Sequence, residues 1–305
     1  MKPSAFMALH LRITHRNDAR GFTTDLKQFR SFYGCSPSNC AILWAKIRQK
    51  KLAPRAEPKH LLWALMFLKL YNTEEAFAGF LGVDKDTFSE WLFHLVKAIA
   101  KLRPDYVSIL QVHSCFGATN NITNNFYYQV KWQNRHRGHS SVKAKVSVDG
   151  TDFRLRQQDD GKLYYSHKFK SSGYRYEVAI SIEKGDIVWV NGPFPCGAFP
   201  DINIFRRGLK NLLLRSGEKA QADLGYRGEP IVIIVPNEYD SKAIKKLKAD
   251  VRARHETANR RLKQYGVLFQ VFRHSLDKHK HCFDACDVLA QMEIISGEPL
   301  YQVQY

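Results

Sequence analysis

The segment Val142-Lys-Ala-Lys-Val-Ser-Val-Asp149 alternates apolar and polar side chains and carries an acid at its end. Such alternation predicts a β-strand with one buried face. Residues 174–182 and 186–191 have similar strand character, and the turn Lys184-Gly185 separates them. Sequential strands joined by short connections predict an antiparallel meander.

The following segments extend this pattern into a mixed α/β fold. We expect a helix over 201–214, strands over 219–223 and 231–235, a long helix over 241–265 and a last helix over 278–295. Three strands, a helix, a strand and a later helix are the element order of a ribonuclease H-like domain. The sequence therefore predicts an RNase H-like domain with a mixed five-stranded sheet over residues 142–305.

Three acids fall at corresponding places on these elements. Asp149 ends the first strand, Asp223 ends the fourth, and Glu256 lies inside the long helix. Hard cations take oxygen ligands, and two ions about 3.5 to 4 Å apart can activate the attacking oxygen on one side of a phosphate and stabilise the leaving oxygen on the other. We therefore predict that these acids are catalytic and bind two Mg²⁺ or Mn²⁺ ions, in a site that cuts phosphodiester bonds.

Each acid alone also has a simpler explanation. Asp149 and Asp223 stand close before glycines and fit turn positions. Glu256 fits the centre of an Arg252, Glu256, Arg260 ladder at i, i+4 spacing, which contributes only a few tenths of a kcal/mol per pair. The joint placement of the three acids is what favours the catalytic interpretation.

The charge of the chain favours a polyanionic partner. Its 305 residues carry a formal net charge of +18, and residues 241–263 alone hold nine bases against two acids. DNA is the expected partner. The side chains expected to hold the strand are Lys168, Lys170, Arg252, Arg260 and Lys263.

No apolar run approaches the roughly 18 residues that span a bilayer, so we expect no membrane anchor or secretion signal. Six cysteines in a chain of this length favour a reducing compartment. The cluster of His279, His281, Cys282 and Cys286 could bind zinc only with ligands from a second segment, and buried or solvated positions within one helix are the simpler explanation.

Residues 1–112 are expected to form an all-α domain that precedes the catalytic one. Within it, Thr73, a turn at Gly82, and Asp84 or Asp86 predict a helix-turn-helix-like pair. The second helix would present Lys85, Thr87 and Ser89 to DNA. The alternative is a plain helical hairpin, with core residues Phe88, Trp91 and Leu92. Residues 113–141, rich in Asn, Gly, Ser and His, are expected to be a polar linker or loop.

Five motifs follow one another along the second part of the chain. They are Val148-Asp-Gly-Thr-Asp152, Tyr165-Ser-His-Lys-Phe-Lys170, Asn191-Gly-Pro-Phe-Pro-Cys-Gly197 with Asp201 after it, Ala222-Asp-Leu-Gly-Tyr-Arg-Gly228 and Arg254-His-Glu-Thr-Ala-Asn-Arg-Arg-Leu-Lys263. In this order they resemble the DDE transposase domain of Harbinger-type elements. The resemblance implies an RNase H-like fold with Asp149, Asp223 and Glu256 as the metal-binding triad. It also implies a helical DNA-binding region and a separate DNA-binding partner protein, and it places Asp201 in a supporting role.

We therefore expect a metal-dependent DNA endonuclease and strand transferase that cuts at transposon ends and resides in the nucleus. Assembly as a homo-oligomer is left open. One alternative is a domesticated DNA-binding regulator that keeps the fold without turnover. Another is an RNase H-like nuclease that cleaves RNA.

Overall fold

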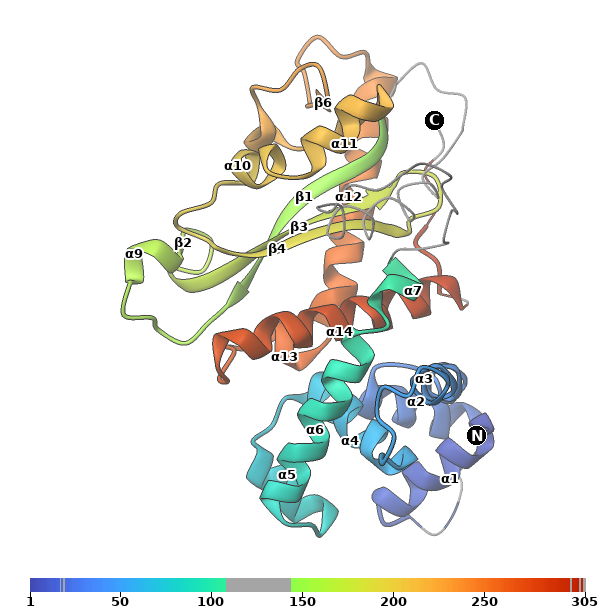
Figure 1. Cartoon of the computed structure of the whole chain (residues 1–305). Coiled ribbons are helices and arrows are strands. Elements are labelled where there is room, and N and C mark those ends of the chain that lie inside the picture. The colour runs from blue at the N-terminus through green and yellow to red at the C-terminus, as the bar shows by residue number, and fades with distance from the viewer. Residues whose placement is uncertain (17, 19, 108–143, 297, 302, 304–305) are drawn as a thin grey trace, which may run out of the picture. The chain divides into compact units, whose positions relative to one another are not determined.

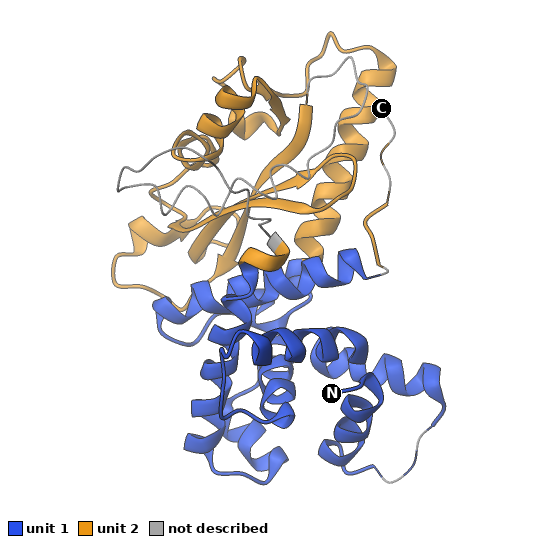
Figure 2. Cartoon of the chain, turned by 45° about the vertical axis from the view of Figure 1, so that its right-hand side comes forward, with its two compact units in different colours: residues 1–103, 262–296 blue, residues 104–261, 297–305 orange. Residues whose placement is uncertain are grey.

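The computed structural model describes residues 1–16, 18, 20–107, 144–296, 298–301 and 303. The chain divides into two compact units (Figure 2). Residues 1–103 and 262–296 form the helical unit, and residues 104–261 and 297–305 form the α/β unit. The predicted linker over 113–141 lies outside the described residues. Residues 262–296 were expected in the catalytic domain, and their place in the helical unit differs from that expectation.

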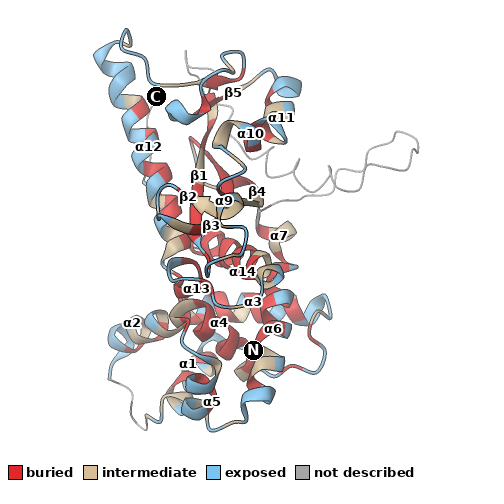
Figure 3. Cartoon of the chain, turned by 90° about the vertical axis from the view of Figure 1, so that its left-hand side faces the viewer, coloured by how far each residue is buried: buried red, intermediate tan, exposed pale blue. Residues whose placement is uncertain are grey.

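The helical unit is built around an apolar central helix, α4. Every residue from Leu61 to Leu68 is buried, so this helix is surrounded by others (Figure 3). The helices of this unit are α1 Pro3–Ile13, α2 Phe22–Tyr33, α3 Pro37–Gln49, α4 Pro58–Leu70, α5 Glu74–Leu81, α6 Lys85–Ala100, α13 Gly266–Phe269 and α14 Leu276–Ile295. The short α7, Arg103–Val107, follows α6.

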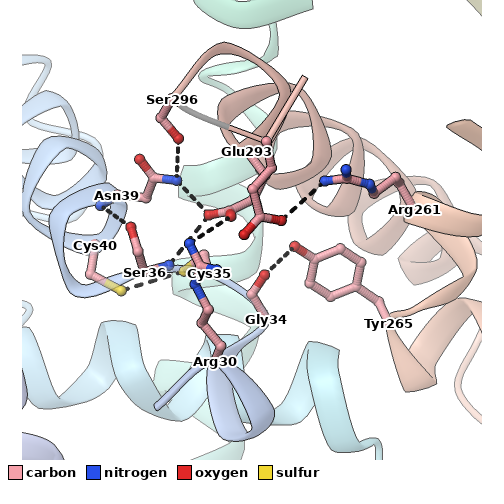
Figure 4. Close-up of polar contacts among 11 residues, drawn as sticks. Arg30, Gly34, Cys35, Ser36, Asn39, Cys40, Arg261, Tyr265, Glu293 and Ser296 are labelled. Atoms are coloured by element: carbon pink, nitrogen blue, oxygen red, sulfur yellow. Dashed lines mark hydrogen bonds and ion pairs between the residues drawn. The ribbon is translucent and has the colours of Figure 1, made fainter. Parts of the chain in front are cut away.

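Buried polar contacts explain why the C-terminal helices join the N-terminal ones (Figure 4). Glu293 of α14 accepts hydrogen bonds from the Asn39 side chain and the Ser36 backbone N–H. Tyr265 donates through its hydroxyl to the carbonyl of Gly34 at 3.1 Å. A buried carboxylate needs such donors, and sequence periodicity does not reveal them.

The predicted helix-turn-helix-like pair has the expected local geometry. Thr73 caps α5 by accepting from the N–H of Ala76, and Gly82 ends the helix in the left-handed conformation. Asp84, rather than Asp86, caps α6. Phe88 and Leu92 are core residues, as the hairpin alternative expected, while Trp91 is half-buried and stacks on a histidine ring.

The α/β unit contains a mixed sheet with six strands among the described residues, one more than expected (Figure 1). Its strands are β1 Ala144–Arg154, β2 Tyr165–Ser166, β3 Ser171–Ser181, β4 Ile187–Pro195, β5 Lys219–Gln221 and β6 Ile233–Ile234. Strand β3 pairs antiparallel with both β1 and β4, which is the predicted meander. Strand β5 runs parallel to β1, and β6 runs parallel to β5. The additional strand is the two-residue β2.

Helices cover both faces of this sheet (Figures 1 and 3). Its helices are α9 Gly161–Tyr164, α10 Asp201–Arg206, α11 Leu209–Ser216, the 3₁₀ turn η2 Leu224–Tyr226 and α12 Lys242–Lys263, whose last residues pass into the helical unit. Val146 and Val148 pack in one core with α10 and α11. Val251 of α12 belongs to a separate core cluster. The alternation of β1 therefore assigns Ser147 and Asp149 to the face that α12 covers.

The helix expected over 201–214 is two helices, because the chain turns at Gly208. A Cβ atom at this position would lie 2.7 Å from the Trp189 ring. The close approach of the backbone to that ring requires glycine, and the helix breaks there.

No helix in the described part of the chain is long and apolar enough to cross a membrane. His279, Cys282 and Cys286 are all buried within α14. Burial raises the pKa of both thiols, so these side chains belong to the core of the helical unit.

Candidate active site

A cavity of about 330 Å³ lies in the α/β unit and brings the three predicted acids onto one surface. Asp149, Asp223 and Glu256 all line it. Ser147 and Gln221 contribute from β1 and β5. The three acids therefore share one cavity, while their joint binding of metal ions stays a prediction.

Asp149 does not end its strand, in contrast to the sequence expectation. Strand β1 continues to Arg154, and Asp149 pairs with Val178 inside an unbroken antiparallel ladder. The turn explanation for the Asp149-Gly150 pair is therefore wrong. Only the pairing with β5 stops here, since Ser147 and Gln221 are its last matched residues.

The parallel pairing of β1 with β5 brings Asp223 close to Asp149. Ser147 pairs with Gln221, and the β1–β5 pairing ends there. Asp149 and Asp223 each come two residues later, so they lie next to each other just beyond the end of the pairing. Asp223 lies just beyond β5 and caps η2, where its Oδ1 accepts from the N–H of Gly225 at 2.8 Å. This cap leaves Asp223 exposed at the cavity.

Asp149 is held in an unfavourable environment for an ionised acid. Burial, followed by the charges of Asp223 and Asp201, raises the pKa of Asp149 to about 7. The Lys168 charge acts in the opposite direction. Crowded carboxylates of this kind are stabilised by an added positive charge.

Asp201 is the third acid of this crowd. Burial raises its pKa, and the charges of Asp152 and Asp223 raise it further, whereas Arg175 lowers it. Arg175 binds Asp152 through two nitrogens, at 2.7 and 3.0 Å, and reaches Asp201 Oδ1 at 3.3 Å. The guanidinium therefore fixes Asp201 next to the cavity acids.

Two fully buried side chains near these acids are kept neutral by their surroundings. Burial raises the pKa of Glu177 to about 8, and the carboxyl accepts from the indole N–H of Trp189 at 2.9 Å. Burial also raises the pKa of Tyr226, as do the charges of Glu177, Asp201, Asp149 and Asp223. The Tyr226 hydroxyl has no hydrogen-bond partner among the described residues. It is an unused polar group close to the acids.

Glu256 lines the cavity but its carboxylate faces solvent. Its side chain is 62% exposed and lies 4.0 Å from Arg252, one turn earlier on α12. Of the i, i+4 ladder considered from the sequence, the structure records the pair of Arg252 and Glu256. Glu256 would have to leave Arg252 to join Asp149.

The donor chemistry suits a hard divalent cation, because the acids around Asp149 supply only oxygen ligands. The side chains of these acids are not arranged as a complete metal site. Within the described ranges, no three His, Cys, Asp or Glu side chains form a group that could hold a metal ion. The exposed orientation of Glu256 is consistent with this.

The predicted DNA contacts have different surroundings. Lys168, Lys170, Arg252 and Arg260 are exposed, and Lys263 is partly exposed. In the helix pair of the helical unit, Thr87 is exposed, whereas Lys85 pairs with Glu75 at 2.5 Å and Ser89 donates to Glu74. The second helix thus directs two of its three expected contacts to acids of its own motif.

Four residues that the sequence did not single out hold α12 against the strands. Ser147 bonds His255, Asn259 donates to Asp149, and Arg254 donates to carbonyls at the end of β3. Burial, followed by the charge of Arg254, lowers the pKa of His255 to about 3, so this ring is neutral. A stripe of residues at helical spacing is the sequence pattern that could have identified the inward face of α12. The stripe consists of Val251, His255, Ala258, Asn259 and Leu262.

Lys248 and Arg254 are buried, so the cationic character of α12 is smaller at its surface than the sequence count indicates. Lys248 binds Asp240 at 2.7 Å. These two bases stabilise the fold and are not available to a nucleic acid.

Comparison of the chain with models of known protein families, with curated proteins and with solved structures finds no match.

Proposed function

We propose that this protein is a metal-dependent DNA endonuclease and strand transferase of the DDE transposase type. The observation that carries the proposal is the shared cavity of Asp149, Asp223 and Glu256 in an α/β unit. The pairing order β4-β3-β1-β5-β6, antiparallel for the first three strands and parallel for the last two, supports an RNase H-like fold. The five sequence motifs support the Harbinger-type resemblance.

Asp149 and Asp223 would hold two Mg²⁺ or Mn²⁺ ions, and Glu256 would complete the set after turning from Arg252. The ions would supply Lewis acidity at the phosphate. Asp149, Asp201 and Asp223 concentrate negative charge at one place, and this concentration favours cation binding. The protein's own contribution is to orient these oxygens on a rigid strand and helix.

The exposed bases would hold the DNA backbone. Lys168 already lies close enough to Asp149 to lower its pKa, so a phosphate bound by Lys168 would lie near the acids. Arg252 and Arg260 project from α12 and would extend the contact. Lys170 and Lys263 would serve in the same way, and Lys85, Thr87 and Ser89 of the helical unit would provide a second DNA contact.

A specific observation favours a second candidate, a DNA-binding regulator without turnover. Glu256 is paired with Arg252, and no ready three-ligand group exists among the described residues. A protein in which Glu256 stays with Arg252 would bind DNA and leave it intact.

The test is cleavage of a supercoiled plasmid that carries the ends of the surrounding genetic element, with Mn²⁺ or Mg²⁺ and any required partner protein supplied. We expect nicks with free 3′-hydroxyls from the wild-type protein and none from Asp149→Asn, Asp223→Asn or Glu256→Gln. DNA binding without nicking by the wild-type protein would favour the regulator. Cleavage of RNA–DNA hybrids but not duplex DNA would favour the RNA-cleaving alternative.

A further inference from the structure

Helix α12 is locked in register on the sheet by buried polar contacts. Arg254 is fully buried, and its guanidinium donates to the carbonyl of Ser181 at 3.0 Å and to that of Ile182. A buried guanidinium is costly unless its donors are satisfied, so these contacts resist sliding of the helix.

Two further contacts connect α12 with β1. The Ser147 hydroxyl and His255 Nδ1 are 2.8 Å apart, and Asn259 Nδ2 donates to Asp149 Oδ2 at 3.0 Å. Four residues of helix rise about 6 Å, and two residues of strand rise about 6.6 Å. The two bonds can therefore form together because the spacings of the helix and the strand match.

We propose that Asn259 is a positioning residue that orients Asp149 for metal binding, an inference that rests on the proposed function. The Asn259 amide donates to Oδ2 of Asp149, and the Gly150 N–H also donates to this carboxylate. The two carboxylate oxygens together offer about four lone pairs, so the group can still bind a cation. The donor is neutral, so it orients the carboxylate without cancelling the charge that attracts a cation.

The Asn259 side chain that makes this contact with Asp149 is buried. Asn259 is 9% exposed, and its Oδ1 has no hydrogen-bond partner among the described residues. The hydrogen bond to Asp149 is thus the polar contact that fixes the amide. The Ser147–His255 contact, in comparison, stabilises the same helix and strand without touching an acid.

This pair of contacts provides a matched control. Full-length wild-type protein, Asn259→Leu and Ser147→Ala would be titrated with Mn²⁺ by calorimetry, and their urea unfolding midpoints would be compared. We expect Asn259→Leu to weaken Mn²⁺ binding about 10-fold or more, as loss of an outer contact to a metal ligand commonly does. Ser147→Ala should lower the unfolding midpoint and keep Mn²⁺ affinity within about twofold of wild type, because it leaves Asp149 and Asn259 in place.

Equal Mn²⁺ affinity of Asn259→Leu and wild type would overturn the inference while leaving the proposed function intact. An equal loss in Ser147→Ala would also overturn it, because the effect would then be a general loosening of α12. Absence of Mn²⁺ binding by the wild-type protein would overturn the proposed function and this inference together. If Asn259→Leu does not fold, Asn259→Ala is measured against the same criteria.

Discussion

Asp201 fills the space that a side chain at Gly150 would need. A Cβ atom at position 150 would come within 1.9 Å of Asp201 Oδ1. Position 150 directly follows Asp149, so the missing side chain is what lets the Asp201 carboxylate approach the strand that carries the cavity acid.

Replacing Gly150 with alanine should therefore displace Asp201. We expect Gly150→Ala to lower the free energy of unfolding by about 1 to 3 kcal/mol, the usual cost of overpacking, and to reduce Mn²⁺ affinity. Urea denaturation and calorimetry measure these effects. Gly161→Ala is the control, because its nearest neighbour would be Gln157 Nε2 at 3.5 Å. Identical behaviour of the two variants would show that Asp201 can move freely.

The pH dependence of the metal-free protein should reveal Asp149. Its pKa is about 7 in the folded state, and about 3.9 is expected in the unfolded state. The folded state binds the extra proton between these values, so the contribution to stability is present at low pH and is lost as pH rises towards 7. The free energy of unfolding should fall by about 3 kcal/mol between pH 5 and pH 7.5 because of this group alone.

Asp149→Asn should remove that part of the slope. Urea unfolding in EDTA at several pH values would measure it, with the exposed Asp159→Asn variant as control. A slope in Asp149→Asn equal to that in Asp159→Asn would contradict the crowding of Asp149 by Asp223 and Asp201.

Glu177 provides a second titration at higher pH. Its pKa is raised to about 8 by burial, so the carboxyl is mostly neutral at pH 7 and becomes charged in the core above pH 8. Glu177→Gln keeps an acceptor for the Trp189 indole. Relative to wild type, this variant should gain about 3 kcal/mol in free energy of unfolding between pH 6 and pH 9.

Chemical denaturation at both pH values tests this expectation, and Glu238→Gln at an exposed site is the control. A constant difference between Glu177→Gln and wild type from pH 6 to pH 9 would mean that Glu177 stays neutral, or is solvated, throughout that range.

The helix pair in the helical unit offers a test of DNA recognition. Glu75 binds Lys85, and this hydrogen bond lowers the pKa of Glu75 and raises that of Lys85. Glu75→Gln should weaken the pair and free Lys85 for a phosphate. We expect tighter binding of duplex DNA at low salt. The slope of log affinity against log salt concentration should become steeper by about one, because one more phosphate is neutralised.

Fluorescence anisotropy at several salt concentrations measures both quantities. Glu90→Gln removes the same charge from an exposed position of α6 and controls for net charge. If the two variants bind DNA equally well, Lys85 does not contact the phosphate backbone.

Local chemistry explains why parts of the fold were predictable. Thr73, Gly82 and Asp84 satisfy backbone groups within one turn of the chain, so their sequence pattern was enough to place α5 and α6. The alternation around Ser147 and Asp149 similarly predicted β1. Long-range contacts were not predictable in this way, since nothing near Glu293 shows that Asn39 satisfies it.

The candidate site was also predictable only in part. The sequence predicted that Asp149 and Asp223 lie close together because it placed both acids at strand ends, although Asp149 lies within β1 and only the pairing with β5 ends beside it. It could not show that Glu256 pairs with Arg252, because helical spacing fits both the ladder and the metal ligand. It gave Asp201 only a supporting role, although Arg175 holds this acid close to the other two.

Anomalous diffraction from crystals of the wild-type protein soaked in Mn²⁺ tests whether the three acids bind a pair of metal ions. We expect two manganese peaks about 3.5 to 4 Å apart, bound by Asp149 and Asp223, with Glu256 turned from Arg252 towards them. Crystals that show no manganese at these acids, or a Glu256 still paired with Arg252 beside a fully occupied site, would contradict it.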